Sequence, residues 1–352
     1  MERYIGLDAH SQSCTLAVMT PTGRRSKELV VETNAPVLRE AIRAIAGSKH
    51  LCMEEGELSQ WLFETLEPLV DELVVIQPPI RQGDKSDAID AWELADRIRT
   101  GRCPKRVFKV AKQLASLREA VRAHSTLTRD LVRCKNRLRG VFRSRAVREL
   151  DATLYDPSSR GAWAKKLPAT HRRRADELGK ELDAITEVHE RVESWLHDEA
   201  ARNRDVQRLT TLPGVGPVRA AQIVATVVSP ARFRTKRQFW SYCGLGIVRR
   251  SSSDWVKDKT RGWERKQVAQ TRGLNQNRNP LLKEAFTAAA LTVIEQMPKH
   301  PLNRDYRRLL DAGTKPNLAR LTIARRIAAA ALAIWKHKED YDPSKHRSQD
   351  AA

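Results

Sequence analysis

The sequence has few cysteines, no long apolar run and no amino-terminal leader pattern, and each absence excludes a class of protein. Its five cysteines, spread over 352 residues, form no Cys-x-x-Cys pair. They predict buried thiols in a reducing compartment rather than a disulfide framework or a cysteine zinc site. The longest apolar stretch, Ile327–Trp335, is too short to cross a bilayer. Because the amino terminus leads directly into a strand pattern, we expect a soluble cytoplasmic protein without a membrane anchor.

Acidic residues are also scarce relative to basic ones, and they are unevenly distributed. The chain has 64 Lys and Arg against 43 Asp and Glu, a net charge of +21. A chain this basic usually binds a polyanion, most often nucleic acid. Residues 1–100 nevertheless carry 17 acids against 11 bases. Carboxylates repel phosphates, so an acidic region in such a protein needs a reason, and bound divalent cations provide one.

The first hundred residues alternate between strand and helix patterns. Three apolar runs of strand length come first, followed by helix, strand, helix, strand and a further helix. The expected strands are Tyr4–Leu7, Cys14–Met19, Leu29–Glu32, Leu51–Met53 and Leu73–Ile76, and the expected helices are Ala35–Ile45, Leu58–Leu69 and one that starts near Asp87. This order predicts an α/β domain with a mixed sheet, as in ribonuclease-H-like (RuvC-like) domains.

Four acidic residues occupy positions where this fold would bring their side chains together. Asp8 lies at the end of the first strand, Glu54 ends a later strand, and Asp87 and Asp90 share one face at the start of a helix. In a ribonuclease-H-like sheet the two strand ends are neighbours and the helix crosses them. Carboxylates gathered in this way can hold two Mg²⁺ ions. Two alternatives stay open: the helix dipole alone favours acids in a first turn, and Glu55 competes with Glu54.

Two long helical patterns follow the α/β region. Apolar side chains recur every three or four residues over 114–141 and again over 178–196, so we expect the two helices to pair antiparallel as a coiled-coil arm. The stretch 105–149 carries 14 basic residues against three acidic ones. A phosphate-contacting surface is the better interpretation of this charge, although a solvated helix face would look similar. The candidate nucleic-acid contacts are Arg133, Arg137 and Arg139.

The segment LPGVG at Leu212–Gly216 lies between two helical patterns. A Gly-Val-Gly turn in this setting is typical of the helix–hairpin–helix motif, in which backbone N–H groups at a helix start bind a phosphate. Gly214 and Gly216 are therefore candidate nucleic-acid contacts, although ordinary helix connections also contain such turns. Helical patterns at Pro280–Ile294 and Leu318–Trp335 predict that the carboxy-terminal domain is mainly α-helical.

Three consecutive serines, residues 251–253, lie in a strongly basic part of the chain. They follow Arg249 and Arg250, and residues 230–273 hold 12 basic residues against three acidic ones. Arginines can neutralise a phosphate and stabilise the charge that develops when a hydroxyl attacks a phosphodiester. From chemistry alone, an ordinary basic loop is the better interpretation.

Taken together, these segments resemble a known family. YIGLDAH, HLCMEEG and DKSDAIDAWELAD, then LPGVGPVRAAQIVA, FWSYCGL, RRSSSDW and LARLTIARRIAAAAL, are similar to the insertion-sequence transposases related to the Piv-type DNA invertases. These are the bridge-RNA-guided DEDD/serine recombinases, and the resemblance extends in order over about residues 3–340. It implies a Mg²⁺-binding DEDD set formed by Asp8, Glu54, Asp87 and Asp90.

The same resemblance implies that Ser252 is a nucleophile. The family commonly has Ser-Gly at this point, whereas Ser252 is followed by another serine, so Ser251 and Ser253 stay open as alternatives. The family also often has a small residue, Thr and Gly after its glutamate, where this chain has Glu-Gly-Glu at residues 55–57. This second departure leaves the choice between Glu54 and Glu55 open.

The resemblance further implies the domain organisation, the reaction and the partners. The implied parts are a RuvC-like DEDD domain at 1–109, a basic coiled-coil arm at 110–203, a transposase domain at 204–340 and a flexible tail at 341–352. The implied protein is a homodimer or homotetramer that cuts and rejoins DNA through a phosphoserine link and is guided by a structured RNA. The alternative is a RuvC-like junction endonuclease that uses metal-activated water and leaves the serines idle.

Overall fold

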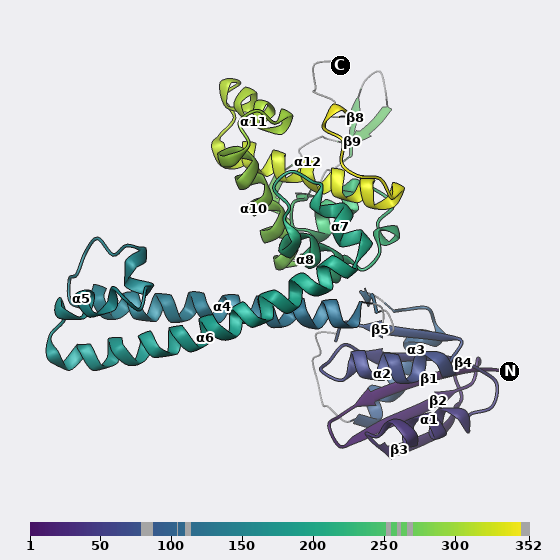
Figure 1. The fold of residues 1–352 in the computed structure, drawn as a ribbon. Helices are drawn as coiled ribbons and strands as arrows, with labels where there is room; N and C mark the ends of the chain where they lie inside the picture. The colour runs from purple at the N-terminus through teal and green to yellow at the C-terminus, as the bar shows by residue number, and fades with distance from the viewer. Residues whose placement is uncertain are drawn as a thin grey trace. The chain divides into compact units, whose positions relative to one another are not determined.

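The computed structural model describes residues 1–78, 87–103, 105–109, 114–250, 255–258, 262–265 and 270–345. The chain forms two compact units, residues 1–113 and 114–352, which we describe separately (Figure 1). Within the described ranges, no helix combines the length and the apolar character that a membrane crossing requires. All five cysteines are free and buried, which confirms the expectation of buried thiols.

The first unit contains a six-stranded mixed sheet. Its strands are β1 (Glu2–Ala9), β2 (Ser13–Met19), β3 (Arg25–Glu32), β4 (Ser48–Glu54), β5 (Glu72–Ile76) and β6 (Arg106–Val107), and their order is β3-β2-β1-β4-β5-β6. β1 pairs antiparallel with β2 and parallel with β4. This mixed sheet is consistent with the ribonuclease-H-like fold that the sequence predicts. The sequence did not predict β6, because two residues are too few to show an alternating pattern.

The two faces of the sheet are covered by different helices. These helices are α1 (Ala35–Arg43), α2 (Ser59–Leu66) and α3 (Asp87–Arg99). Ile5 and Leu7 of β1 share a buried cluster with Leu38 of α1 and Leu62 of α2. Side chains alternate along a strand, so Gly6 and its neighbours two residues away face the other side, where α3 packs. The sheet therefore has an α1/α2 face and an α3 face.

Helix α3 lies directly on β1 at Gly6. A Cβ atom at this position would be 1.8 Å from the carbonyl oxygen of Ala91 and 2.6 Å from the backbone nitrogen of Ala95. No real Cβ atom fits at such distances, so only glycine allows this approach. The contact determines how closely the first turns of α3 approach the sheet.

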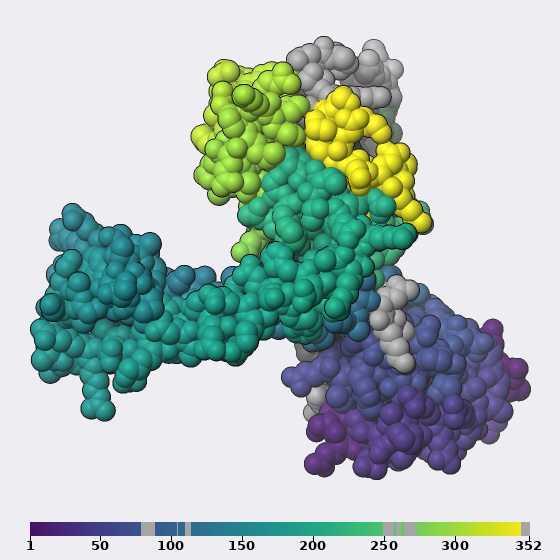
Figure 2. Space-filling view, viewed as in Figure 1, coloured from purple at the N-terminus to yellow at the C-terminus, as the bar shows by residue number. Residues whose placement is uncertain are grey.

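The second unit begins with two long helices that lie side by side. They are α4 (Ala115–Arg143) and α6 (Ala169–Arg202), with the short α5 (Arg160–Lys165) between them in sequence (Figure 1). Leu117 of α4 shares a buried cluster with Leu196 of α6, and Leu138 shares another with Leu182. These pairings run in opposite directions along the two helices, so the helices are antiparallel, as the periodicity predicts, and Figure 2 shows them packed against each other. The second helix begins nine residues earlier than the expected start at Leu178.

The remaining helices of this unit pack around one core. They are α7 (Arg204–Thr210), α8 (Pro217–Val227), α9 (Lys236–Tyr242), α10 (Pro280–Gln296), α11 (Pro301–Asp311) and α12 (Pro316–His337). Val224, Phe239, Phe286 and Ile327 belong to a single buried cluster. The mainly helical character predicted for this part of the chain is confirmed. The sequence did not predict α11, whose polar surface gives a weak apolar pattern.

The basic segment predicted as a loop contains four short strands. They are β7 (Ile247–Arg250), β8 (Trp255–Asp258), β9 (Gly262–Arg265) and β10 (Gln270–Leu274). β7 pairs antiparallel with β10, and β8 pairs antiparallel with β9. The loop prediction was wrong for these strands, because the charged residues hid their alternation.

Candidate functional site

Asp8 and Glu54 lie on neighbouring parallel strands at the same edge of the sheet. The register pairs Leu7 of β1 with Met53 of β4, and Asp8 and Glu54 are the next residue on each strand. Leu7 and Met53 are buried on the α1/α2 face, so alternation directs Asp8 and Glu54 to the α3 face. The Asp8 side chain is only 14% exposed.

Helix α3 brings its acidic first turn to the same face. Asp90 lies one turn before Leu94, which is buried with Cys52 of β4, and Asp90 itself is 5% exposed. Asp87 lies one turn before Ala91, the residue that meets Gly6. The helical position of Asp87 is described, but its side chain lies outside the described part. The seat of α3 on Gly6 therefore places the start of this helix on the face that carries Asp8 and Glu54.

Glu55, the alternative to Glu54, has different partners. Lys109 Nζ lies 2.8 Å from Glu55 Oε2, and the hydroxyl of Ser59 donates to the same oxygen at 3.1 Å. The Lys109 side chain is only 9% exposed and that of Glu55 is 37% exposed, so the ion pair is partly enclosed. The geometry favours Glu54 over Glu55, and the assignment of both residues stays a prediction.

The donor chemistry of the acidic edge fits Mg²⁺. Carboxylate oxygens are the hard ligands that Mg²⁺ takes from proteins. Among the described side chains, those of Asp8, Glu54 and Asp90 do not place three ligand atoms within 4.8 Å of one another. Their side chains would therefore have to turn closer together to share one ion.

His10 is a neighbour of this edge that the sequence reasoning missed. Its Nε2 atom lies 3.2 Å from Oδ2 of Asp8. The two residues are separated by one position in YIGLDAH, and residues two apart on an extended segment share a face. That spacing was a signal that could have identified the contact.

The three arginines predicted to contact nucleic acid have different surroundings. Arg133 pairs with Asp130 on the same helix, and Arg137 pairs across the helices with Glu181. The hydrogen bond that Arg137 donates to the Glu181 carboxylate raises the pKa of Arg137. Both arginines are exposed, but a phosphate would have to compete with these carboxylates.

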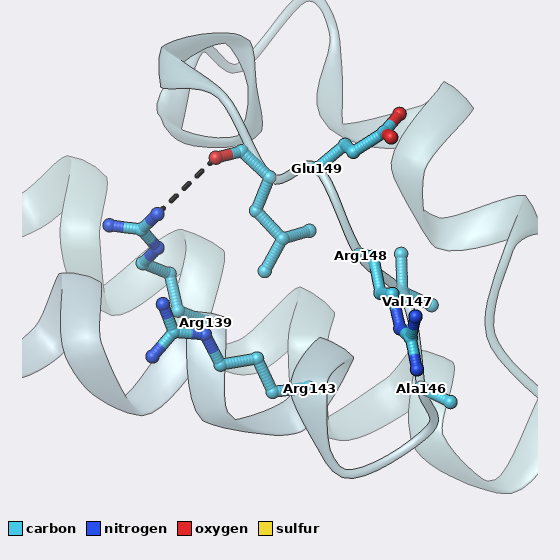
Figure 3. A pocket seen from close by; sticks show the side chains of 7 residues that line it. Arg139, Arg143, Ala146, Val147, Arg148 and Glu149 are labelled. Carbon is cyan, nitrogen blue, oxygen red and sulfur yellow. Dashed lines mark hydrogen bonds between the residues drawn. The ribbon is translucent and has the colours of Figure 1, made fainter.

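Arg139 lines a pocket where α4 ends. The pocket has a volume of about 560 Å³, and Arg143 and Arg148 line it as well (Figure 3). The Arg139 guanidinium donates to the carbonyl oxygen of Leu150 at 3.3 Å, the bond drawn in Figure 3. The three arginines outnumber the one carboxylate of the lining, Glu149, so the pocket is suited to an anion such as a phosphate. The sequence reasoning identified Arg139 but not Arg143, which lies one turn later on α4, nor Arg148, whose position at the pocket depends on the chain turning back after α4.

The two glycines of the predicted helix–hairpin–helix turn have different roles. Gly214 has φ +71°, and a Cβ atom there would lie 2.3 Å from the carbonyl oxygen of Ala289. Its own carbonyl oxygen accepts a hydrogen bond from Arg219 at 2.7 Å. Gly216 is the exposed N-cap residue of α8, with open space around its Cβ position. Gly214 therefore shapes the turn, and Gly216 leaves the start of α8 accessible.

The predicted nucleophile lies outside the described residues. Ser251, Ser252 and Ser253 all fall in this gap. Arg249 and Arg250 end β7, where their backbones pair with Thr271 and Gln270 of β10, and nothing is described of their side chains. The serine assignment stays a prediction.

The fold and the acidic edge define a class of protein. A mixed sheet with helices, consistent with the ribonuclease-H-like fold, bears carboxylates at one edge, and the same chain continues into a mainly helical unit. Comparison with known families makes this specific. A DEDD model described as "Transposase" matches residues 5–145, and a model described as "Transposase IS116/IS110/IS902 family" matches residues 206–307. The chain belongs to the IS116/IS110/IS902 family of transposases and has a DEDD amino-terminal domain.

Curated relatives agree with this family. The chain is 27% identical over 173 residues to a "Probable family 20 transposase" of Pseudomonas aeruginosa, covering 47% of this chain and 51% of the relative. It is 24% identical over 173 residues to the "Transposase for insertion sequence element IS1533" of Leptospira borgpetersenii, covering 47% of this chain and 50% of the relative. The chain thus spans about half the length of the curated relatives it matches.

Proposed function

We propose that this protein is the transposase of an insertion sequence and that it cuts and rejoins DNA strands. One observation carries the proposal: Asp8 and Glu54 lie side by side at the edge of two parallel strands, on the face to which α3 brings Asp90. The transposase family to which the chain belongs also supports this proposal.

In this proposal the acidic edge is a Mg²⁺ site. Its ligands would be Asp8, Glu54, Asp87 and Asp90. Bound Mg²⁺ would neutralise the scissile phosphate and favour ionisation of the attacking oxygen. Two contacts support this assignment: the one at Gly6 seats α3 on the sheet, and the ion pair with Lys109 occupies Glu55.

Ser252 supplies the attacking hydroxyl in this proposal. Its Oγ atom forms a bond to phosphorus while the bond from phosphorus to one DNA oxygen breaks; the serine gives its hydroxyl proton to a base or to water, and the DNA oxygen takes up a proton and leaves as a free hydroxyl. Arg249 and Arg250 would balance the charge that develops on the phosphate. The support for this step is the resemblance around RRSSSDW and the basic character of residues 230–273.

The proposed partners are DNA, a structured guide RNA and further copies of this chain. The start of α8 at Gly216 would contact a DNA phosphate, and the basic arm, including the pocket at Arg139, would contact RNA. A homodimer or homotetramer would bring two sets of DNA ends together. The charge of the arm and the family resemblance support these assignments.

The metal site can be tested with matched carboxylate variants. Purified full-length protein would be incubated with Mg²⁺, DNA carrying the element ends, and RNA transcribed from the neighbouring noncoding sequence, and cut and joined strands would be counted. We expect Asp8→Asn and Glu54→Gln to lower the rate by about 10²–10³-fold, the usual loss when a group that stabilises transition-state charge is removed. Glu57→Gln, an exposed control three residues after Glu54, should keep full activity. Full activity of Asp8→Asn would contradict the proposal.

A covalent assay separates the recombinase from the junction endonuclease. We expect wild-type protein to form a phosphoserine–DNA adduct that survives denaturation, and Ser252→Ala to lose both the adduct and strand joining. Adduct formation that is lost only in Ser251→Ala or Ser253→Ala would move the nucleophile to that serine. If all three variants cleave like wild type without an adduct, the alternative, a RuvC-like junction endonuclease, is correct.

A further inference from the structure

A second cluster of possible metal ligands lies in the arm. Ligand atoms of His124, His189 and Glu193 all lie within 4.8 Å of one another, and this is the one such group of three among the described residues. His124 belongs to α4, whereas the other two residues lie one turn apart on α6. The cluster therefore bridges the two long helices.

The ligand atoms of the cluster lie somewhat farther apart than those of a zinc site. The two imidazole rings lie 4.7 Å apart between centroids, and His189 Nδ1 is 3.8 Å from Glu193 Oε2. Metal–ligand bonds of about 2.0–2.1 Å would place tetrahedral ligand atoms about 3.3 Å apart. Modest side-chain rotations would close this difference.

The surroundings of His124 indicate that a ligand is needed there. His124 is 7% exposed, and its Nδ1 atom is buried with no hydrogen-bond partner in the structure. Buried polar atoms are nearly always satisfied, so an orphan of this kind requires an explanation. On α4 it lies between Val121 and Cys134, which belong to two separate apolar clusters of the helix pair. A position that would ordinarily hold an apolar side chain thus carries an imidazole that faces another imidazole.

The imidazole of His189 already has a hydrogen-bond partner, Thr128. The Nε2 atom of His189 lies 3.1 Å from the hydroxyl oxygen of Thr128, which leaves Nδ1 facing Glu193. Histidine ligands of metals usually use one nitrogen for the ion and hold the ring in place with the other. Burial, and then the neighbouring His189, lower the pKa of His124, which favours the neutral imidazole that metals bind.

We propose that His124, His189 and Glu193 bind a Zn²⁺ ion that fastens α4 to α6 in the middle of the arm. Two imidazole nitrogens and one carboxylate oxygen form a ligand set that Zn²⁺ accepts, whereas Mg²⁺ prefers oxygen ligands alone. The fourth ligand is water or His197, whose Nε2 lies 4.0 Å from the other Glu193 oxygen. The ion lies between the two apolar clusters of the arm and links α4 to α6 at the polar position that separates them. This site is separate from the acidic edge and does not depend on the proposed transposase activity.

Zinc binding can be measured on the full chain without any activity assay. Protein stripped with a chelator would be titrated with Zn²⁺ against a chromophoric competitor, in excess Mg²⁺ so that carboxylate sites are occupied. We expect one tight equivalent of Zn²⁺ per chain and a higher melting temperature of the helical signal in circular dichroism, because an ion that binds only the folded state stabilises it. His189→Gln and Glu193→Gln should each weaken Zn²⁺ binding by roughly tenfold or more.

A matched control variant shows how far the loss of one negative charge by itself changes Zn²⁺ binding. Glu190→Gln removes an exposed carboxylate next to His189 and should bind Zn²⁺ like wild type. Glu193 is 42% exposed, so Glu193→Gln should keep the fold even if a histidine variant does not, and circular dichroism of the zinc-free proteins checks this. Absence of a tight equivalent in wild type, or equal binding by Glu193→Gln and Glu190→Gln, would overturn the proposal.

Discussion

Replacing Gly6 with alanine perturbs the contact that seats α3 on the sheet. The new Cβ would lie 1.8 Å from the carbonyl oxygen of Ala91, and ordinary contacts begin at 3.4 Å, so α3 must retreat by about 1.6 Å. Both colliding groups are backbone, and no side-chain rotation can relieve the overlap. Overpacking usually costs about 1–3 kcal/mol, and a backbone collision belongs at the upper end of this range. The same displacement would carry Asp90 away from Asp8, and a misplacement of 1 Å can cost about 10²-fold in rate.

The assay follows tryptophan emission, to which Trp92 in the displaced helix contributes together with the other tryptophans among the eight in the chain. Trp92 of α3 is buried, and its Nε1 donates to Glu28 Oε2 at 2.6 Å. Urea unfolding followed by tryptophan emission should show a loss of about 3 kcal/mol for Gly6→Ala. Gly56→Ala is the matched control, since a Cβ there meets no atom within 4 Å, and its stability should change by less than about 0.5 kcal/mol. If the stability of Gly6→Ala also stays within about 0.5 kcal/mol of wild type, the close contact between α3 and β1 at Gly6 is contradicted.

Four further predictions concern the rest of the chain. Asp305→Ala removes the ion-pair partner of Arg326 from a largely buried position, and should lower the free energy of unfolding by about 3–5 kcal/mol in a urea titration; a loss below 1 kcal/mol would contradict this. Gly140 lies inside α4, and a Cβ atom there would have open space around it. Gly140→Ala should therefore stabilise the protein by about 0.5–1 kcal/mol in the same titration, and a loss of stability would contradict this prediction. Gly214→Ala should destabilise the chain and weaken DNA binding, whereas Gly216→Ala should keep the fold, as thermal melting and a DNA titration would show; equal melting temperatures would contradict the distinction. Burial raises the pKa of each of the five thiols, so a thiol reagent should react slowly with native protein and rapidly after denaturation, and rapid reaction of native protein would argue against their burial.

The order of elements in the first unit was predictable because its signals are local. Tyr4–Leu7 and Cys14–Met19 are apolar runs of strand length, and both lie within strands of the structure. The long arm helices were predictable for the same reason, since an apolar residue every three or four positions needs no knowledge of the partner helix. Local signals were misleading at Trp255–Asp258 and Gly262–Arg265, where charged residues occupy two strands that pair antiparallel.

The candidate site was predictable only in part. Asp8 and Glu54 stood out because each acid follows an apolar strand, but the difference between Glu54 and Glu55 depends on Lys109, which lies more than fifty residues away in the chain. The pairing of His124 with His189 was equally hidden, because His124 fits the apolar periodicity of its own helix. Such contacts depend on the register between distant segments, and a single sequence does not display that register.

The sequence by itself determined the order of the first five strands and three helices, the two long helices of the arm, the acidic character of the first hundred residues, and the motifs that indicate an insertion-sequence transposase. These properties depend on residues that are close in the chain. Only the tertiary structure decided that Lys109 pairs with Glu55, that Arg139 shares a pocket with Arg148, and that two histidines meet in the arm. Each of these depends on strand register, helix crossing or close backbone approach, and the packing of the whole unit sets all three.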